Sequence, residues 1–252
     1  MNTFSALSEI YDSFNERADY QSYLSFIQKK FNQYCSVAPG YQPRAVDLGC
    51  GTGEMSVALA LQGFDVIGVD QSCEMLSQAM DKLNDHPELA LFFIRQDMRR
   101  LQMDAKANLF ISCYDCLNYL NNENELALTL DRISSHLVDG GLLIFDVNTL
   151  YRFETYYGDH TFVYKKSDSV LVWENHYNKE NRQCFFDIEI FQKEGGLYRR
   201  SREKHKQSYF SEAVIDAALE KAGFRINETI SDRQLWGREG PELKRVYVAQ
   251  KQ

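Results

Sequence analysis

One stretch constrains the fold of this chain more than any other: a short apolar strand, three alternating glycines and an apolar helix. Residues 45–48 read Ala-Val-Asp-Leu, Gly49, Gly51 and Gly53 follow, and residues 54–62 continue as a helical apolar run. Glycines at this spacing let the backbone turn tightly and let a ligand lie directly on the main chain. The helix that follows points unpaired N–H groups at the same place. The stretch therefore predicts a ligand-binding loop at the edge of an α/β sheet.

Acidic residues follow at the ends of the next two predicted strands. Residues 65–69 predict a second strand that ends at Asp70, and residues 90–94 predict a third that ends near Asp97. An acid about 20 residues after the glycines can accept hydrogen bonds from both hydroxyls of a ribose. Any one of these acids could equally be a helix cap. Together with Asp47 on the first strand, the ordered set favours a ligand site at one edge of a parallel sheet.

Strand and helix patterns alternate along the first part of the chain. Two further strands are expected at 108–113 and 142–146, and helices at 73–84 and 123–137, the last closed by Gly140-Gly141. Such alternation predicts a doubly wound parallel sheet covered by helices on both faces.

The pattern changes at residue 151. Residues 151–210 are rich in alternating strand residues with turn signals between them, which predicts an antiparallel meander. A helix over 211–222 and two closing strands at 225–230 and 244–249 follow. We therefore expect an α/β fold: a Rossmann-like sheet built from 1–150 and 211–252, with an inserted antiparallel β subdomain.

The first motif resembles that of the class I S-adenosylmethionine-dependent methyltransferases. Asp47-Leu-Gly-Cys-Gly-Thr-Gly53 has the acid, the hydrophobic residue and the G-x-G-x-G of that family. The resemblance implies S-adenosyl-L-methionine as the cofactor and a Rossmann-like methyltransferase sheet. It also implies roles for individual residues: Asp47 as the acid of the cofactor-binding motif, Gly49, Cys50 and Gly51 under the methionyl part, Asp70 at the ribose, Gln71 and Met75 beside the adenine, and Asp97 with the Met98 backbone at its edge.

Three tyrosines extend this resemblance to the methyl-transfer centre. Residues 1–38 predict two amphipathic helices interrupted by the polar segment 15–19, and Tyr11 and Tyr20 flank that interruption. The arrangement resembles the N-terminal flap of small-molecule methyltransferases, and the insert at 151–210 resembles their lid. Tyr11, Tyr20 and Tyr114 are the candidates for aromatic faces around the sulfonium. Packing in the core is an equal alternative for these tyrosines.

The resemblance implies a small molecule as the methyl acceptor. Enzymes of this class that methylate exocyclic base nitrogens often carry N/D-P-P-Y/F after the fourth strand, whereas this chain has Tyr-Asp-Cys-Leu at 114–117. A general base is needed only if the acceptor must lose a proton first. Asp115, Asp146, Glu174 and His176 could serve, and nothing in the sequence singles one out.

Two other classes of function remain open at this stage. A nicotinamide-dependent oxidoreductase would need G-x-G-x-x-G, and the third position after Gly51 is Glu54. A module that binds the cofactor without catalysis is also compatible, because fold does not fix function.

The composition limits the kinds of partner that we expect for this protein. The 252 residues carry a formal net charge of −8, which gives no footprint for nucleic acid. No apolar run approaches the ~18 residues of a membrane span, and no signal peptide begins the chain, so we expect a cytoplasmic protein. Cys113 and Cys116 form a C-x-x-C without a second pair or a nearby histidine, so we expect packing rather than a metal site.

Overall fold

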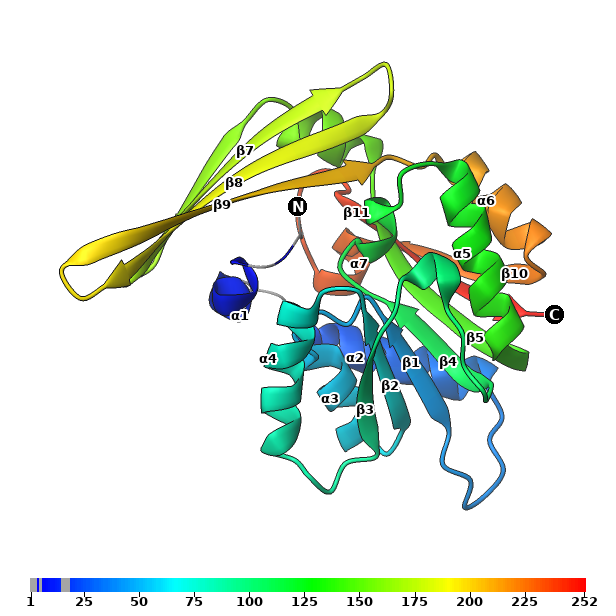
Figure 1. Ribbon diagram of the computed structural model, residues 1–252. Helices are drawn as coiled ribbons and strands as arrows, with labels where there is room; N and C mark the ends of the chain where they lie inside the picture. Colours follow the sequence, from blue (N-terminus) through cyan, green and yellow to red (C-terminus); the bar gives the residue numbers. More distant parts are fainter. Residues whose placement is uncertain (1–3, 5, 15–18) are drawn as a thin grey trace.

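Two β-sheets organise the chain. The computed structural model describes residues 4, 6–14 and 19–252 (Figure 1). The larger sheet has seven strands in the order β10-β11-β5-β4-β1-β2-β3. Their bounds are β1 Arg44–Leu48, β2 Asp65–Asp70, β3 Leu91–Arg95, β4 Ala107–Ser112, β5 Leu137–Asn148, β10 Phe224–Ser231 and β11 Lys244–Lys251.

The larger sheet is parallel in its first five strands and closes with an antiparallel hairpin. β1 pairs in parallel with β2 and β4, and β11 pairs antiparallel with both β5 and β10. Because β1, β2 and β4 run in the same direction, Leu48, Asp70 and Ser112 end their strands at one edge of the sheet. The predicted α/β class, its parallel strands and its closing hairpin are confirmed.

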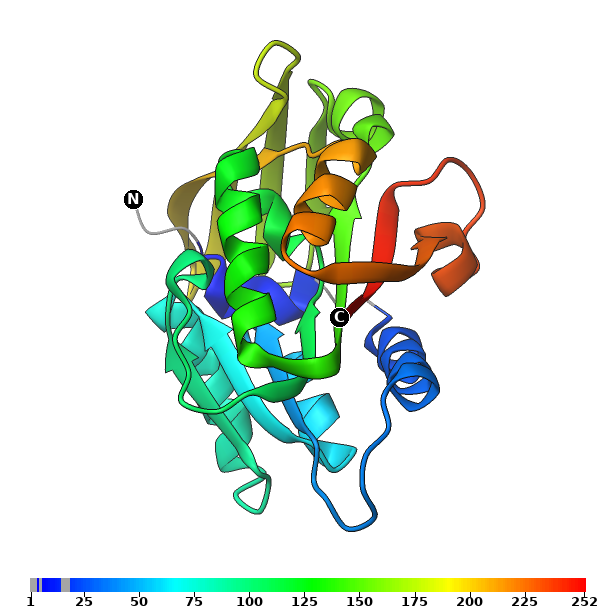
Figure 2. The ribbon, with the colours of Figure 1, turned by 90° about the vertical axis from the view of Figure 1, so that its right-hand side faces the viewer.

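Helices cover both faces of this sheet, and each face has its own apolar core. The helices are α2 Tyr20–Tyr34, α3 Glu54–Leu61, α4 Cys73–Asn84, α5 Glu123–His136 and α6 Glu212–Lys221. Strand residues alternate between the faces: Val46 and Leu48 pack toward α5 and α6, whereas Ala45 packs toward α2 and α3. Figure 2 shows green α5 and orange α6 on the opposite side of the sheet from blue α2.

The smaller sheet contains four antiparallel strands, as predicted for the insert. They are β6 Thr161–Lys165, β7 Ser169–Asn178, β8 Gln183–Glu194 and β9 Leu197–Ser208, paired in chain order. This sheet projects from the larger one in Figure 1. Its apolar face packs on Phe153 and Tyr157 of the π-helical turn η4 (Arg152–Tyr157) and on Leu7 and Ile10 of the N-terminal segment.

The structure corrects the prediction in two places. The helix α5 ends at His136, so Gly140-Gly141 lies inside the irregular start of β5 instead of capping the helix. Only the turn η1 (Ser8–Ile10) and the short helix α1 (Tyr11–Phe14) form where a longer first helix was expected. The predicted break at 15–19 lies outside the described residues except for Asp19, which caps α2 by accepting a hydrogen bond from Ser22.

Three further short elements, in addition to η4, were not predicted. They are η2 (Met98–Arg100), η3 (Cys116–Tyr119) and α7 (Asp232–Trp236). The first two follow β3 and β4 at the edge of the sheet where the acids gather, and α7 follows β10. Among the described helices, none is both long enough and apolar enough to cross a membrane.

The glycine at the start of α3 provides a test of local packing. Gly53 has a φ of +80°, and a Cβ there would lie 2.8 Å from Phe93 and 2.9 Å from Ala79. Gly63 has a φ of +89°, but a Cβ there would meet no described heavy atom beyond its chain neighbours within 4 Å. We expect Gly63→Ala to lower the free energy of unfolding by ~1–2 kcal/mol through backbone strain. Gly53→Ala should lower it by a further ~1–3 kcal/mol through crowding. Urea denaturation measures both, and equal losses would contradict the packing argument.

Candidate active site

The glycine loop opens onto a large pocket. Gly49 and Gly51 line a pocket of about 790 Å³ at the carboxyl edge of the larger sheet. The amides of Gly49 and Cys50 donate to the carbonyl of Val69, at 2.7 and 3.0 Å, which ties the loop to β2. A Cβ on Gly51 would meet no described heavy atom beyond its chain neighbours within 4 Å, so the loop leaves open space beside its main chain.

Asp70 lies at the end of β2, beside this loop. Its carboxylate accepts hydrogen bonds from the amides of Gly51 (3.0 Å) and Ser72 (2.9 Å). Burial raises the pKa of the Asp70 carboxyl, and these hydrogen bonds oppose that rise. Gln71 and Met75 follow it into α4 and line the same pocket. The side chain is thus fixed with its carboxylate on the pocket wall.

Asp97 and Met98 form the next part of the wall, after β3. Asp97 caps η2 by accepting from the amide of Arg99, and it also pairs with the Arg99 guanidinium at 2.5 Å. The hydrogen bonds from the Arg99 side chain lower the pKa of Asp97 despite its partial burial. Asp97 is therefore a charged acceptor at this end of the pocket.

The three predicted tyrosines lie on the pocket wall. The rings of Tyr20 and Tyr114 meet edge to face with their centroids 5.1 Å apart. Tyr11 is brought there by α1, whose Asp12 accepts a hydrogen bond from Thr52 of the glycine loop (2.6 Å) and pairs with Lys82 of α4. These contacts bring the N-terminal segment against the loop.

Two predicted residues do not line the pocket. Asp47 is buried beneath the loop and accepts a hydrogen bond from Ser56 Oγ at 2.6 Å. Cys50 points its sulfur toward the carbonyl of Gly51, at 3.9 Å. The structure therefore gathers Tyr11, Tyr20, Gly49, Gly51, Asp70, Gln71, Met75, Asp97, Met98 and Tyr114 on one pocket wall and leaves Asp47 and Cys50 behind it.

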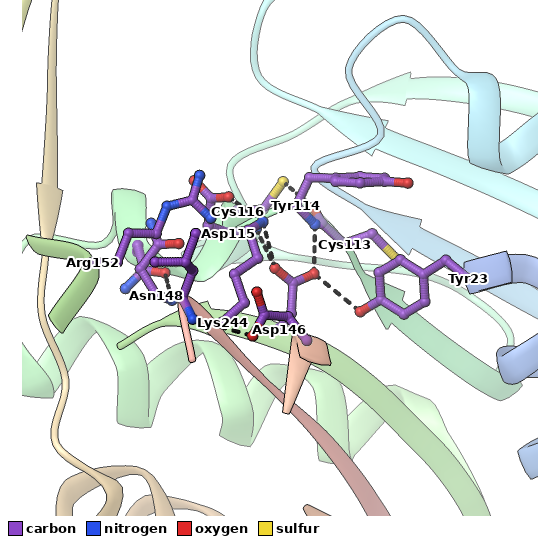
Figure 3. A network of polar contacts seen from close by, with 12 residues as sticks. Tyr23, Cys113, Tyr114, Asp115, Cys116, Asp146, Asn148, Arg152 and Lys244 are labelled. Carbon is purple, nitrogen blue, oxygen red and sulfur yellow. Dashed lines mark hydrogen bonds and ion pairs between the residues drawn. The ribbon is translucent and has the colours of Figure 1, made fainter. Parts of the chain in front are cut away.

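A buried polar network supports the pocket at the end of β5 (Figure 3). Asp146 Oδ1 accepts from Tyr23 Oη (3.0 Å) and the Tyr114 amide (2.6 Å). Its Oδ2 accepts from the Asp115 amide (2.9 Å) and Lys244 Nζ (2.8 Å). Lys244 also binds Asp115. Tyr114 and Asp115 both have left-handed backbones, with φ of +59° and +58°, and the carboxylate of Asp146 holds their two amides together.

Burial alone would raise the pKa of Asp115, but the charges of Lys244 and Arg152 hold it below its usual value. Asp146 has no exposed surface and lies behind the pocket wall. The other two residues considered as bases, Glu174 and His176, are exposed on β7 and do not line the pocket.

Sequence reasoning missed several residues that η3, η4, the smaller sheet and β11 contribute to the pocket wall. These are Tyr119, Arg152, Tyr156, Tyr157, Trp173, His205, Gln207 and Lys244. Arg152 Nε donates to Tyr157 Oη at 2.9 Å, and its guanidinium lies 5.1 Å from the centre of that ring. The two adjacent tyrosines at 156–157 could have suggested an aromatic pocket wall, but the neighbouring sequence does not indicate which way their rings face.

Three polar atoms in the pocket wall lack a hydrogen-bond partner among the described residues. They are the hydroxyl of Tyr114 and the indole nitrogens of Trp173 and Trp236. Buried polar groups are normally paired, so each of these atoms is a place where a ligand can bind. Two of them are indole N–H groups, which can only donate.

Comparisons with known proteins agree with this geometry. Residues 45–141 match the family model of the methyltransferase domain. A putative methyltransferase of Geobacillus is 32% identical, covering 91% of this chain and 92% of its own. The putative methyltransferase YqeM of Bacillus subtilis is 29% identical, covering 91% and 89%. A crystal structure of an S-adenosylmethionine-dependent methyltransferase from Clostridium acetobutylicum is 26% identical, with a TM-score of 0.86 over 99% of both chains.

A seven-stranded sheet with a glycine loop, a strand-tip acid and a pocket at its carboxyl edge defines a class I methyltransferase fold. The chain belongs to the S-adenosylmethionine-dependent methyltransferases. The wall residues fit this cofactor: open space beside Gly51 accommodates a ligand against the main chain, and Asp70 presents an acceptor beside it. Membership of this family argues against the oxidoreductase alternative.

The buried Asp47 predicts a pH dependence of stability. Burial raises the pKa of Asp47 to about 7, and the hydrogen bond from Ser56 only partly opposes this. An unfolded aspartate has a pKa of about 3.9. Between these values the folded state holds a proton that the unfolded state has lost, so this residue makes stability fall as pH rises from about 4 to 7. Asp47→Asn keeps an acceptor for Ser56 and removes the titration.

We therefore expect Asp47→Asn to gain stability relative to the original chain as pH rises from 5 to 8, by roughly 1–3 kcal/mol. Urea denaturation at several pH values measures the difference. A difference that does not change with pH would show that Asp47 ionises in the folded state as it does in the unfolded one.

Proposed function

We propose that this methyltransferase acts on a small molecule held between the glycine loop and the smaller sheet. The observation that carries the proposal is the continuous pocket, whose wall runs from Gly49 and Asp70 to Trp173 and Tyr157. Its volume of about 790 Å³ suits small-molecule ligands. The net charge of −8 also favours a small molecule over a nucleic acid as the acceptor.

The wall residues divide the pocket between cofactor and acceptor. Asp70 would hold the ribose of S-adenosylmethionine, Gln71 and Met75 would contact the adenine, and Asp97 with Met98 would bind its edge. Tyr11, Tyr20 and Tyr114 would surround the methionyl end, and Asp47 and Cys50 would support the loop from behind. The acceptor then lies toward η4 and β7, where Trp173 offers an unpaired N–H.

The domain arrangement follows from the same division. Residues 1–150 and 211–252 form the cofactor-binding part, with 1–38 as its flap, and residues 151–210 form a lid. Two contacts support a joint role for flap and lid: Leu7 N donates to Glu203 of β9 at 3.0 Å, and Arg199 pairs with Glu9 at 2.5 Å. The flap residues described here therefore contact both the glycine loop and the lid.

Relatives that methylate small amines support the choice of acceptor. A dTDP-3-amino-3,4,6-trideoxy-alpha-D-glucopyranose N,N-dimethyltransferase of Streptomyces venezuelae is 23% identical over 72% of this chain. A glycine/sarcosine N-methyltransferase of Halorhodospira halochloris is 33% identical over 41% of it. Both names describe methyl transfer to nitrogen of a small molecule, and an amine is accordingly the first class of acceptor to test.

The protein contributes to catalysis mainly by aligning the methyl donor with the acceptor. S-adenosylmethionine supplies a methyl group that is already activated by the positive sulfonium. The chain orients donor and acceptor, and its aromatic walls exclude water. Rings such as those of Tyr20 and Tyr114 favour a cation near their faces.

The cofactor assignment predicts a specific loss of affinity. Asp70→Ala should weaken binding of S-adenosylhomocysteine by roughly 10- to 100-fold, because hydrogen bonds to a charged acceptor contribute about 1.5–3 kcal/mol. Asp65→Ala is the matched control: Asp65 begins the same strand and pairs with Arg44 at 2.6 Å, outside the pocket lining. Isothermal titration calorimetry measures both variants. Equal affinities of the two variants, or tight binding of NAD by the unmutated protein, would contradict the assignment.

The acceptor assignment predicts methylation of small molecules. The protein, incubated with methyl-labelled cofactor and an ultrafiltered extract of Bacillus subtilis, should transfer label to compounds that pass the filter, and most strongly to amines. Mass spectrometry then identifies the product. Label that appears only in the protein or nucleic-acid fraction of an unfiltered extract would overturn the small-molecule assignment.

A further inference from the structure

Three polar side chains, those of Tyr119, His205 and Glu203, contact one another in series at the lid side of the pocket. The hydroxyl of Tyr119, in η3, lies 3.2 Å from Nδ1 of His205, in β9. Nε2 of the same imidazole lies 2.9 Å from Oε2 of Glu203. His205 and Glu203 are 3% and 4% exposed. Tyr119 and His205 both line the pocket, whereas Glu203 does not.

The contacts around Glu203 fix the direction of these hydrogen bonds. Burial alone would raise its pKa, but hydrogen bonds from His205 and from the amide of Leu7 lower the pKa of Glu203 to about 2. An ionised carboxylate only accepts, so Nε2 of His205 carries a hydrogen. In the neutral imidazole Nδ1 then has a free lone pair, which accepts the hydroxyl proton of Tyr119. Burial raises the pKa of Tyr119, which keeps that hydroxyl protonated.

Tyr119 lies on the pocket wall, in a short element that also contacts the glycine loop. It ends the short helix that begins at Cys116, whose sulfur lies 3.2 Å from the carbonyl of Gly49 in the cofactor loop. The titratable groups that act on Tyr119 from the surrounding elements are Tyr11 of α1, Asp115 and Cys116 of the η3 turn, and Tyr157 of η4, in addition to His205 and Glu203 of β9.

The other carboxylates near the pocket are poorly suited to take a proton. Asp115 is bound by Lys244 and accepts from Gln207 at 2.6 Å, and its pKa is lowered by the nearby cations. Asp146 already accepts four hydrogen bonds behind the wall. Histidine is the side chain that most often takes up a proton in general-base catalysis.

We propose that Tyr119 and His205, held in place by Glu203, form the proton-accepting pair of the methyl-transfer reaction. The N–H or O–H bond of the acceptor breaks as its nucleophilic atom bonds to the methyl carbon. Tyr119 Oη takes the released proton and passes its own proton to His205 Nδ1. The electron pair of the broken carbon–sulfur bond remains on sulfur, and the positive charge moves to the imidazolium. This inference rests on the proposed function, because it assumes a small acceptor in this pocket.

Four variants test the pair in the full-length protein. Tyr119→Phe and His205→Gln remove the two proton-accepting steps, and Glu203→Gln keeps an acceptor for Leu7 but removes the charge. His176→Gln is the matched control, because His176 contacts Asp159 (2.7 Å) on the exposed face of β7. Label transfer to the ultrafiltered extract at high dilution measures relative kcat/KM between pH 5 and 9. Calorimetry with S-adenosylhomocysteine and thermal unfolding report on cofactor binding and the fold.

We expect Tyr119→Phe and His205→Gln to lower kcat/KM at pH 7 by about 100-fold or more, with cofactor affinity changed by less than about twofold. Any loss of activity that the original protein shows at low pH should be absent in His205→Gln. Glu203→Gln removes the negative charge beside the imidazole, so its pH profile should differ from that of the original protein.

The outcomes separate this proposal from the one on which it rests. A protein that binds S-adenosylhomocysteine but labels no small molecule overturns the proposed function and this inference together. A second outcome overturns the proton-accepting pair alone. Small molecules are labelled normally, but kcat/KM still falls at low pH in His205→Gln, and the pH profile of Glu203→Gln matches that of the original protein. A loss of activity that is equal at every pH, or that follows loss of cofactor affinity, shows a structural role and also overturns it.

Discussion

The buried carboxylate of Asp146 joins three elements behind the pocket wall: α2, the turn after β4 and β11. It takes one hydrogen bond from α2, two from the turn after β4 and one from Lys244 of β11. Left-handed residues other than glycine are strained, and two of them in succession persist only where the surroundings hold them. Asp146 provides that restraint for Tyr114 and Asp115. Because Lys244 serves both carboxylates, loss of Lys244 would leave buried negative charge uncompensated, which typically destabilises by about 3–5 kcal/mol.

Most of the larger sheet could be predicted from the sequence because local signals specify it. The glycine loop, the strand-tip acids and the Ser211 cap of α6 each depend on a few neighbouring residues. The two incorrect helix predictions also have local causes. Gly140 suggested a helix end, but its left-handed φ of +76° is used in the irregular start of β5. The helix expected before residue 15 shortened because its amides at Leu7 and nearby donate to Glu203 instead of continuing a helix.

The acceptor side of the pocket could not be predicted in the same way, because its contacts join residues far apart in the chain. Lys244 meets Asp115 across 129 positions, and His205 meets Tyr119 across 86. Neither pair has a spacing that a motif could encode. His176 seemed as good a base as any from sequence, yet alternation along a strand turns it outward on β7, whereas His205 on β9 faces the pocket. The difference depends on which face of the smaller sheet is covered.

The N-terminal segment and η4 together cover the apolar face of the smaller sheet. Leu7 and Ile10 pack on the apolar side of the smaller sheet, and Asp12 binds Thr52 of the glycine loop. A segment of a few residues is thus attached at one end to the lid and at the other to the loop that would hold the cofactor. Its contacts with Glu203 are also contacts with the carboxylate that orients His205. This segment therefore connects the glycine loop to the carboxylate beside His205.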